Sequence, residues 1–260
     1  MSRSLVDRAV GGPGARRSAG AVPPSPASVT LFGCFRLVVG GEDVALPLGV
    51  QRLVALLALR GRAGRSRLAG QLWPDTEEDR ALASLRTAMW RANRAVPGLV
   101  AGVGPSLDLG PALTVDARDL VRVARRLTQG DRPGPEAMTC LPDNDAELLP
   151  DWDDEWLVDE RERMRQLCLH VQEAFADHLA ADGHFGLALE VAFAVLRHDA
   201  LRESAHRSVI RIHLAEGNVS EARRAYATCQ RVLRQELGIP PSPATARMMA
   251  LPPERGVRRA

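Results

Sequence analysis

The chain has 260 residues, of which 45% are hydrophobic and 25% are charged, so it can bury a core and form one large domain or two small ones. All 34 basic residues are arginine, which excludes a phosphate-binding loop ending in Gly-Lys-Ser/Thr and a lysine that forms Schiff bases. The four cysteines lie far apart without a C-x-x-C pair. They indicate neither a zinc knuckle nor a redox dithiol, and they fit the reduced thiols of a cytoplasm.

The net charge of +2 is unevenly distributed along the chain. Residues 28–114 hold ten arginines and seven acids, whereas residues 115–245 hold sixteen arginines and twenty-three acids. A basic first half and an acidic second half indicate two different partners. Residues 1–27 hold four arginines and one acid among many Gly and Pro residues, and we predict that they form a disordered, weakly basic arm.

A small antiparallel sheet and two helices are predicted at the start of the ordered chain. Residues 29–46, VTLFGCFRLVVGGEDVAL, alternate apolar and polar side chains around a Gly-Gly turn. An amphipathic helix that ends at a glycine follows over residues 49–61. A second helix is expected over residues 66–73, with Ser66 as its N-cap.

The third predicted helix, residues 77–98, separates apolar from basic side chains at helical spacing. Its apolar stripe consists of Leu82, Leu85, Met89, Ala92 and Val96. The opposite face holds Arg80, Ser84, Thr87, Arg91 and Arg94, with Arg86 at its edge. No acid occurs between Arg80 and Arg94, so this basic face needs a partner from elsewhere or lies in solvent.

After this helix, two alternating pieces, Leu107/Leu109 and Leu113/Val115, flank a Gly-Pro pair and predict a hairpin. A small sheet, three helices and a hairpin are typical of a winged helix-turn-helix, which we place at residues 28–114. In such a motif the second helix enters the major groove, where arginine pairs with guanine edges or phosphates. The basic face of residues 77–98 is therefore predicted to contact DNA, although an isolated helix with this pattern would more often be a solvated surface.

A basic turn, LRGRAGRSRL, precedes the second helix and contains Arg60, Arg62, Arg65 and Arg67. It is either a solvated loop or a phosphate anchor beside a helix N-terminus, and we include Arg65 and Arg67 among the predicted DNA contacts. Trp90 flanks the apolar stripe. We predict that it is a core or interface ring, because proteins that recognise duplexes rarely stack on bases.

From Asp116 onward the sequence predicts helices throughout. An amphipathic helix at residues 117–129 and a Pro- and Gly-rich break precede a helix of unusual length. Beyond it, two segments share a skeleton with a period of 34 residues, which is typical of tetratricopeptide-like helix pairs. In this skeleton Gly183 matches Gly217, Phe185 matches Val219 and Ala188 matches Ala222. We expect a compact helical array at residues 115–248 and a flexible tail at residues 249–260.

No pattern in the sequence predicts catalysis. The acids Asp151, Asp153, Asp154 and Glu155 could form a carboxylate pair or a metal site, but such residues more often cap and polarise a helix N-terminus. The histidines include no H-E-x-x-H, and neither G-x-S-x-G nor a G-x-G-x-x-G after a strand occurs. We predict a protein that is not an enzyme and that has no cofactor and no metal.

Several of these segments together resemble a known family. They are VTLFGCFRLVVGGEDVAL, RLAGQLWPD, LASLRTAMWRANRAVPG, LLPDWDDEWLVDERERMRQLCLHVQEA and the stretch that ends in ELGIPPSPAT. Over residues 29 to about 248 the chain is similar to activators of the Streptomyces antibiotic regulatory protein (SARP) type. The resemblance implies an OmpR-type winged helix joined to a bacterial transcriptional activation domain. It also implies binding to promoter direct repeats as a tandem dimer, recruitment of RNA polymerase holoenzyme and, frequently, control of an antibiotic biosynthetic gene cluster.

Two features depart from the family pattern. Asn93 stands where similar recognition helices usually carry another basic residue, and GVGPSLDLGP is less polar than most family wings. Both departures predict a weaker grip on phosphate. The chain also resembles the short form of the family, which lacks the ATPase domain of larger relatives.

We therefore expect a sequence-specific transcriptional activator in the cytoplasm, at the nucleoid, with double-stranded DNA and polymerase as partners and no membrane contact. The winged domain should recognise DNA alone, so a fragment that ends near Asp116 should still bind it. The alternative is a helical adaptor or signal sensor whose winged domain binds protein. Steep weakening of binding with salt would distinguish DNA binding from that alternative.

Overall fold

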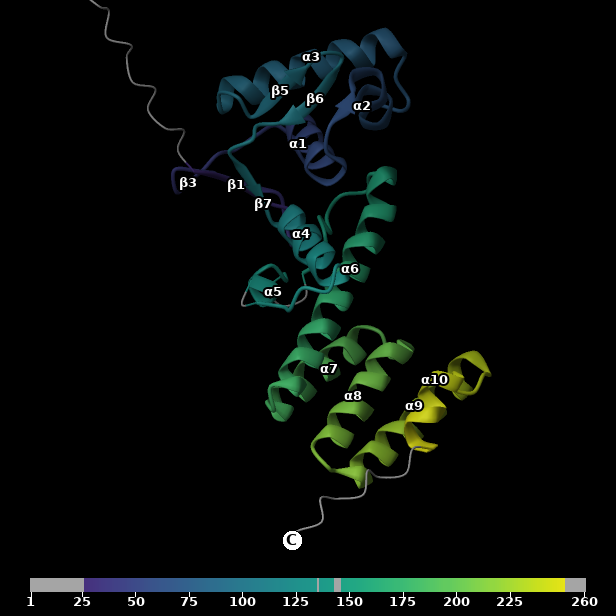
Figure 1. Ribbon diagram of the computed structural model, residues 1–260. Helices are drawn as coiled ribbons and strands as arrows, with labels where there is room; N and C mark the ends of the chain where they lie inside the picture. Colours follow the sequence, from purple (N-terminus) through teal and green to yellow (C-terminus); the bar gives the residue numbers. More distant parts are fainter. Residues whose placement is uncertain (1–25, 135, 143–145, 251–260) are drawn as a thin grey trace, which may run out of the picture.

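The computed structural model describes residues 26–134, 136–142 and 146–250 (Figure 1). The predicted arm at residues 1–27 and tail at residues 249–260 lie mostly outside the described residues, although the first strand begins at Ala27 and the last helix ends at Ala250. The described chain begins with short strands and three helices, and the elements from Asp116 onward are all helices. This is the mainly α architecture that the sequence predicted.

The first sheet has four strands in the order β3-β2-β1-β7. They are β1 (Ala27–Thr30), β2 (Arg36–Val39), β3 (Glu42–Asp43) and β7 (Leu113–Val115). β1 pairs antiparallel with β2 and parallel with β7, and this register places Val29 opposite both Leu37 and Val115. All three side chains are buried, so one face of the sheet packs on the core.

Three helices and a second, three-stranded sheet follow. The helices are α1 (Leu48–Arg60), α2 (Arg65–Leu72) and α3 (Glu78–Ala95). The sheet has the order β4-β6-β5, with β4 at Ala63–Gly64, β5 at Val100–Val103 and β6 at Ser106–Leu109. Together with the first sheet these elements form the predicted winged helix-turn-helix.

The predicted hairpin was wrong in its pairing. Leu107 and Leu109 do lie in a wing strand, β6, but its partner is β5, and Leu113–Val115 joins the first sheet instead. Residues 100–115 contain two Gly-Pro pairs, and the wing turns at the first of them, at Gly104 with φ +60°. At the second pair, a Cβ on Gly110 would lie 2.3 Å from the carbonyl oxygen of Gly98, so this glycine is needed for a close backbone approach.

The prediction that Ser66 caps α2 was also wrong. The helix begins one residue earlier, with Gly64 at the N-cap position and no side-chain cap. Gly64 belongs to β4, where it pairs with Ser106 of the wing. The start of α2 is therefore set by the short strand before it rather than by a hydroxyl group.

The second half of the chain contains seven helices among the described residues. They are α4 (Asp116–Thr128), α5 (Glu136–Thr139), α6 (Glu155–Ala181), α7 (Phe185–His198), α8 (Glu203–Ala215), α9 (Val219–Leu237) and α10 (Pro243–Ala250). Gly183 and Gly217 each follow the first helix of a pair, and both have φ +83°. Ala188 and Ala222 are both fully buried. The 34-residue repeat is therefore a pair of helical hairpins, α6–α7 and α8–α9.

One hydrophobic core extends across the predicted domain boundary. It contains Leu57 of α1, Leu120 of α4 and Leu157 of α6, all fully buried, within a single cluster that continues to Val171. Figure 1 shows the reason, because α6 runs from beside the winged region down to α7 and the remaining helices. The upper part of α6 therefore packs as part of the winged region.

Asp116, at the start of α4, holds this helix to the residues that follow β1 through hydrogen bonds. Its Oδ2 accepts from the backbone N–H groups of Leu31, at 2.8 Å, and Phe32, at 3.1 Å. Its Oδ1 accepts from the N–H of Ala117. Burial raises the pKa of this carboxyl above its usual range, and the three amide hydrogen bonds offset only part of that effect.

Two further groups of polar contacts join α6 to the winged region. Arg60 donates to Glu160 Oε1 at 3.0 Å and to the carbonyl of Trp156 at 3.1 Å. Arg161 donates to the carbonyl groups of Leu148, Leu149 and Trp152, which closes the loop whose Leu149 N–H bonds to Leu31. These contacts give Glu160 and Arg161 of the segment DWDDEWLVDERERM a structural role.

Candidate nucleic-acid interface

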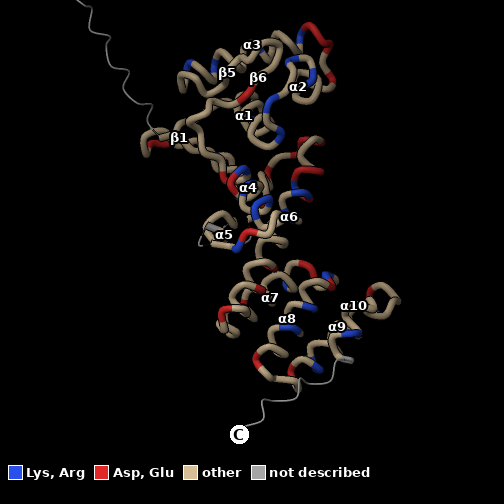
Figure 2. The backbone as a smooth tube through the Cα atoms, viewed as in Figure 1, with Lys and Arg blue, Asp and Glu red and all other residues tan. Residues whose placement is uncertain are grey.

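The outward face of α3 carries four exposed arginines, Arg80, Arg86, Arg91 and Arg94. None of the four forms an ion pair with any acid in residues 26–134, 136–142 or 146–250. The acids of this helix, Glu78 and Asp79, lie in its first turn, and Figure 2 shows basic positions along the rest of it. The surface is therefore a stripe of uncompensated positive charge.

The opposite face of α3 is buried against the winged core. Ala81, Leu85, Ala88 and Ala92 are the buried residues of the helix, and Leu82, Met89 and Val96 pack partly against the same cluster. The predicted apolar stripe is therefore confirmed, with its centre moved toward the alanines. Small side chains there let α3 approach α1 and α2 closely, and the arginines consequently face away from the core.

The basic face divides into two flanks, and the flank beside the wing brings three predicted residues together. Arg65, Arg86 and Arg94 line one shallow hollow with Met89, Trp90 and Asn93. Arg65 donates to the carbonyl of Gly104 at 2.7 Å, so its guanidinium lies at the turn of the wing. Three cationic groups from α2 and α3 therefore converge on one concave surface.

Trp90 and Asn93 complete this flank. Trp90 is 58% exposed, so of the two predicted roles, a core ring or an interface ring, the core role is excluded. The Arg94 guanidinium lies over its ring at 5.1 Å from the centroid. Asn93 accepts from the N–H of Val100 and donates to its carbonyl, at 3.0 and 2.8 Å. An arginine at position 93 would lose this paired contact, so Asn93 fixes the wing to α3.

The other flank of α3 holds the remaining residues predicted on this helix, apart from Arg80. Ser84, Thr87 and Arg91 line a hollow with Trp73 and the beginning of α1. Ser84 is half-buried, and the Thr87 hydroxyl donates to the carbonyl of Ala83 at 3.0 Å. Arg91 is the basic member of this flank, while Arg80 lies exposed in the first turn of the helix.

Arg67 does not join either flank of α3. It is exposed on α2 and lines a separate hollow with Arg62, Glu160 and Arg163, facing α6. Arg62 also donates to the carbonyl of Val103 in the wing, at 3.2 Å. Of the two predicted residues in the basic turn, the structure therefore brings Arg65 to the α3 surface and leaves Arg67 on another side.

The acidic cluster at residues 151–155 has the predicted role only in part, because Glu155 lies in the first turn of α6, where the helix dipole favours an acid. Asp154 is at the N-cap position of α6, but its side chain caps no backbone N–H group. It instead forms an ion pair with Arg52 of α1 and accepts from the indole N–H of Trp156. Within the described ranges, no three His, Cys, Asp or Glu side chains are grouped to hold a metal ion, and no helix is long and apolar enough to cross a membrane.

The sequence interpretation missed Trp90 and Asn93 as members of the surface, and it missed the contact of Arg62 with the wing. Trp90 is four residues from both Arg86 and Arg94, a spacing that places all three on one side of a helix, so its position could have been inferred. The contacts of Asn93 and Arg62 depend on which strand pairs with which in the wing. No local pattern predicted that pairing.

The fold and this surface define a class of protein, in which a winged helix-turn-helix is joined to tetratricopeptide-like helix pairs. A solved structure with this fold is described as Mycobacterium tuberculosis EmbR in complex with a low affinity phosphopeptide. It matches with a TM-score of 0.68 and 19% sequence identity, over 87% of this chain and 64% of the EmbR chain. This chain thus spans less than two thirds of the EmbR length, and the likeness concerns the fold. No curated protein matches the sequence.

The family follows from the second half of the chain. Residues 116–250 match the bacterial transcriptional activator domain, and the chain belongs to this family. It is a transcriptional regulator of the SARP type, as the resemblance predicted.

Proposed function

We propose that this regulator binds specific sites on double-stranded DNA and activates transcription, with α3 in the major groove. The observation that carries the proposal is the stripe of four arginines on α3, which has no acidic partner within the described chain and lies opposite a buried face. An α-helix fits the major groove, and arginine is the side chain that most often reads guanine there. The charges are thus placed where a duplex would compensate them.

The wing-side flank suits the sugar-phosphate backbone and an adjacent base. Arg65, Arg86 and Arg94 surround one hollow, and phosphate contacts of this kind position a protein on the duplex. The exposed ring of Trp90 offers an apolar surface of the type that contacts a thymine methyl group. This flank would therefore supply both affinity and part of the sequence preference.

The acidic helical domain is suited to a protein partner. Residues 115–245 carry more acids than arginines, and a surface of this sign repels phosphate but favours basic protein surfaces. Together with the family resemblance, this supports recruitment of RNA polymerase holoenzyme. The proposals that the protein binds promoter direct repeats as a tandem dimer and controls an antibiotic biosynthetic gene cluster rest on the resemblance alone.

Arginine substitutions on α3 test the DNA contact. Arg91→Ala and Arg94→Ala should weaken binding to a site selected from random duplexes, whereas Arg231→Ala, which removes an exposed arginine from α9, should not. An arginine that pairs with a guanine should cost about 1–3 kcal/mol and relax preference at one base pair. One that contacts only phosphate should weaken all sequences alike and lower the salt slope by about one.

Stability measurements separate loss of contact from loss of fold. Exposed substitutions such as these should change the free energy of unfolding by no more than about 0.5 kcal/mol, whereas Leu85→Ala, at a buried position of α3, should cost about 2–5 kcal/mol. Unchanged affinity in both arginine variants would show that α3 does not enter the groove. Binding that is insensitive to salt would favour the adaptor alternative.

The spacing of the binding sites tests the tandem arrangement. Half-sites about 10–11 base pairs apart place two recognition helices on one face of the duplex. Inserting about five base pairs should move one protomer to the far side and abolish cooperative binding in a footprinting titration. Cooperativity that survives the insertion would contradict side-by-side binding.

A further inference from the structure

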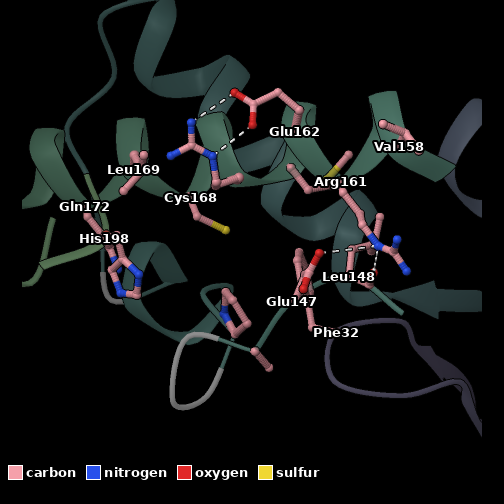
Figure 3. A pocket seen from close by; sticks show the side chains of 14 residues that line it. Phe32, Glu147, Leu148, Val158, Arg161, Glu162, Cys168, Leu169, Gln172 and His198 are labelled. Carbon is pink, nitrogen blue, oxygen red and sulfur yellow. Dashed lines mark hydrogen bonds and ion pairs between the residues drawn. The ribbon is translucent and has the colours of Figure 1, made fainter. Parts of the chain in front are cut away.

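A cavity of about 510 Å³ lies between the first sheet and the helical half of the chain, away from the basic face of α3 (Figure 3). Phe32 follows β1, and Leu148 pairs with it as an isolated bridge. The facing wall comes from α6, and His198, at the end of α7, closes one side. A volume of this size falls within the range of small-molecule sites in proteins.

The inner surface of the cavity is mainly apolar. Phe32, Leu148, Met164 and Leu169 are buried residues that line it, and in Figure 3 the sulfur atom of Cys168 points toward its middle. Apolar walls favour an apolar occupant, because binding removes both surfaces from water. The occupant is therefore expected to be mostly hydrocarbon or aromatic.

The charges at the rim are already compensated by one another. Arg161 lies 3.4 Å from Glu147, and Arg165 donates to Glu162 at 2.9 Å and lies 3.6 Å from Asp199. An anionic or cationic ligand would have to displace one of these partners. The rim consequently favours a ligand without net charge.

One wall residue offers a specific polar contact. Gln172 lines the cavity, and its Oε1 atom is buried without a hydrogen-bond partner in the part of the chain that the structure describes. A buried acceptor that lacks a partner is unfavourable, because the hydrogen bonds it made to water in the unfolded chain are not replaced. Rotation of the terminal amide toward the cavity would let a hydroxyl or N–H group of a ligand donate to this oxygen.

From these features we infer that the cavity binds a neutral, largely apolar small molecule that donates a hydrogen bond to Gln172. Phe32 belongs to the winged region and Cys168 to α6, so such a ligand contacts both halves of the protein at once. Binding at this cavity requires no DNA. A failure of the ligand site and a failure of the α3 surface would therefore be seen in separate experiments.

A neutral fluorescent dye tests the cavity directly. Nile red should bind the full chain with a stoichiometry of one and gain fluorescence in an apolar environment. Two substitutions that fill the cavity from opposite walls, Cys168→Phe and Ala146→Phe, should each weaken dye binding at least tenfold. Ala227→Phe, which adds the same ring at an exposed site on α9, should leave it unchanged.

The melting temperature of each variant shows that it is folded, and a second filling variant keeps the test decisive if the first unfolds. No binding of Nile red to the wild type would overturn the proposal. Equal binding to the wild type and to both filled variants would overturn it as well, because the dye would then occupy another surface.

A pair of ligands of nearly equal size tests the hydrogen bond to Gln172. 2-Naphthol carries a hydroxyl donor and 2-methoxynaphthalene does not, so 2-naphthol should displace Nile red at a concentration about threefold to tenfold lower. Gln172→Leu keeps a similar side-chain volume but removes the acceptor. It should abolish this preference without preventing dye binding, and a preference that persists in the variant would exclude Gln172 as the acceptor.

Discussion

The winged region and the C-terminal helices are built around cores of different composition. In the first, large side chains such as Leu53, Leu57 and Leu120 meet in one continuous cluster that extends from Val29 to Val171. In the second, the cluster is formed by Ala176, Ala188, Ala192, Val209 and Ile212. The first core is therefore filled mainly by large side chains, whereas three of the five buried residues of the second are alanines, which let the helices approach closely.

The boundary between the two cores does not coincide with the position at which the charge and the sequence pattern change. The charge changes sign near residue 115, but the large-residue core continues through α4 and into α6, as far as Val171. The alanine-rich core begins at Ala176, only five residues further along the same helix. α6 thus belongs to both regions, and a line drawn at Asp116 divides a shared core.

Truncation should have the largest effect on folding. Because the first core ends within α6, a fragment that ends before this helix should behave differently from one that ends after it. A fragment that ends at Asp116 loses Leu120 and Leu157 from the core, so we now expect it to lack a cooperative thermal transition, contrary to the expectation from sequence. A fragment that ends at Ala181 keeps the whole of α6 and should melt cooperatively by circular dichroism. Cooperative folding of the shorter fragment would restore the boundary at Asp116.

A cavity-forming substitution should distinguish the first core. Leu57 of α1 is fully buried in the core that the winged region shares with α4. Leu57→Ala should lower the free energy of unfolding by about 2–5 kcal/mol, because the site cannot collapse completely. Urea titration measures the change. A loss below about 1 kcal/mol would mean that this part of the core is loosely packed.

The second core should be sensitive to the opposite change. Ala188 of α7 is fully buried in a cluster with Ala176 of α6 and Val209 of α8. Ala188→Leu should lower the free energy of unfolding by about 1–3 kcal/mol through overpacking. Ala227→Leu, at an exposed position of α9, is the matched control and should change stability by no more than about 0.5 kcal/mol. Tolerance of leucine at position 188 would indicate that close helix approach is not required there.

Much of the fold was predictable because its signals are local. The apolar stripe of α3 and the 34-residue period of Gly183 and Gly217 each follow from spacing along one or two helices. The wing was not predictable in the same way. Its two Gly-Pro pairs look alike in sequence, and only the close approach of Gly110 to Gly98 shows which of them is not the turn.

Some residues of the candidate site were also predictable from local sequence, and others were not. The basic face of α3 follows from helical periodicity alone, so its arginines could be identified from the sequence. Whether Arg65 or Arg67 joins that face depends on the packing of α2 against the wing and α6, which no local pattern encodes. The same holds for Asp154, whose partner Arg52 is on another helix.

The smallest expected effect concerns Asp116, at the point where the sequence placed the boundary. Asp116→Asn can keep the acceptor for the N–H groups of Leu31 and Phe32 but loses the one for Ala117. It also removes a charge that burial disfavours. These effects oppose each other, so we expect a change in the free energy of unfolding of about 1 kcal/mol or less near neutral pH.

The raised pKa of Asp116 determines how the stability difference between the wild type and Asp116→Asn changes with pH. Because the pKa of Asp116 is raised in the folded chain, the folded state binds the proton more tightly than the unfolded state does. The stabilisation from this group is therefore complete below the unfolded pKa, about 3.9, and is lost as the pH rises through the folded value. Stability measured in urea between about pH 4 and pH 7 should fall for the wild type relative to Asp116→Asn. A difference that is constant over this range would show that the three amide hydrogen bonds balance the effect of burial on the pKa of Asp116, and a change in the opposite direction would show that they outweigh it.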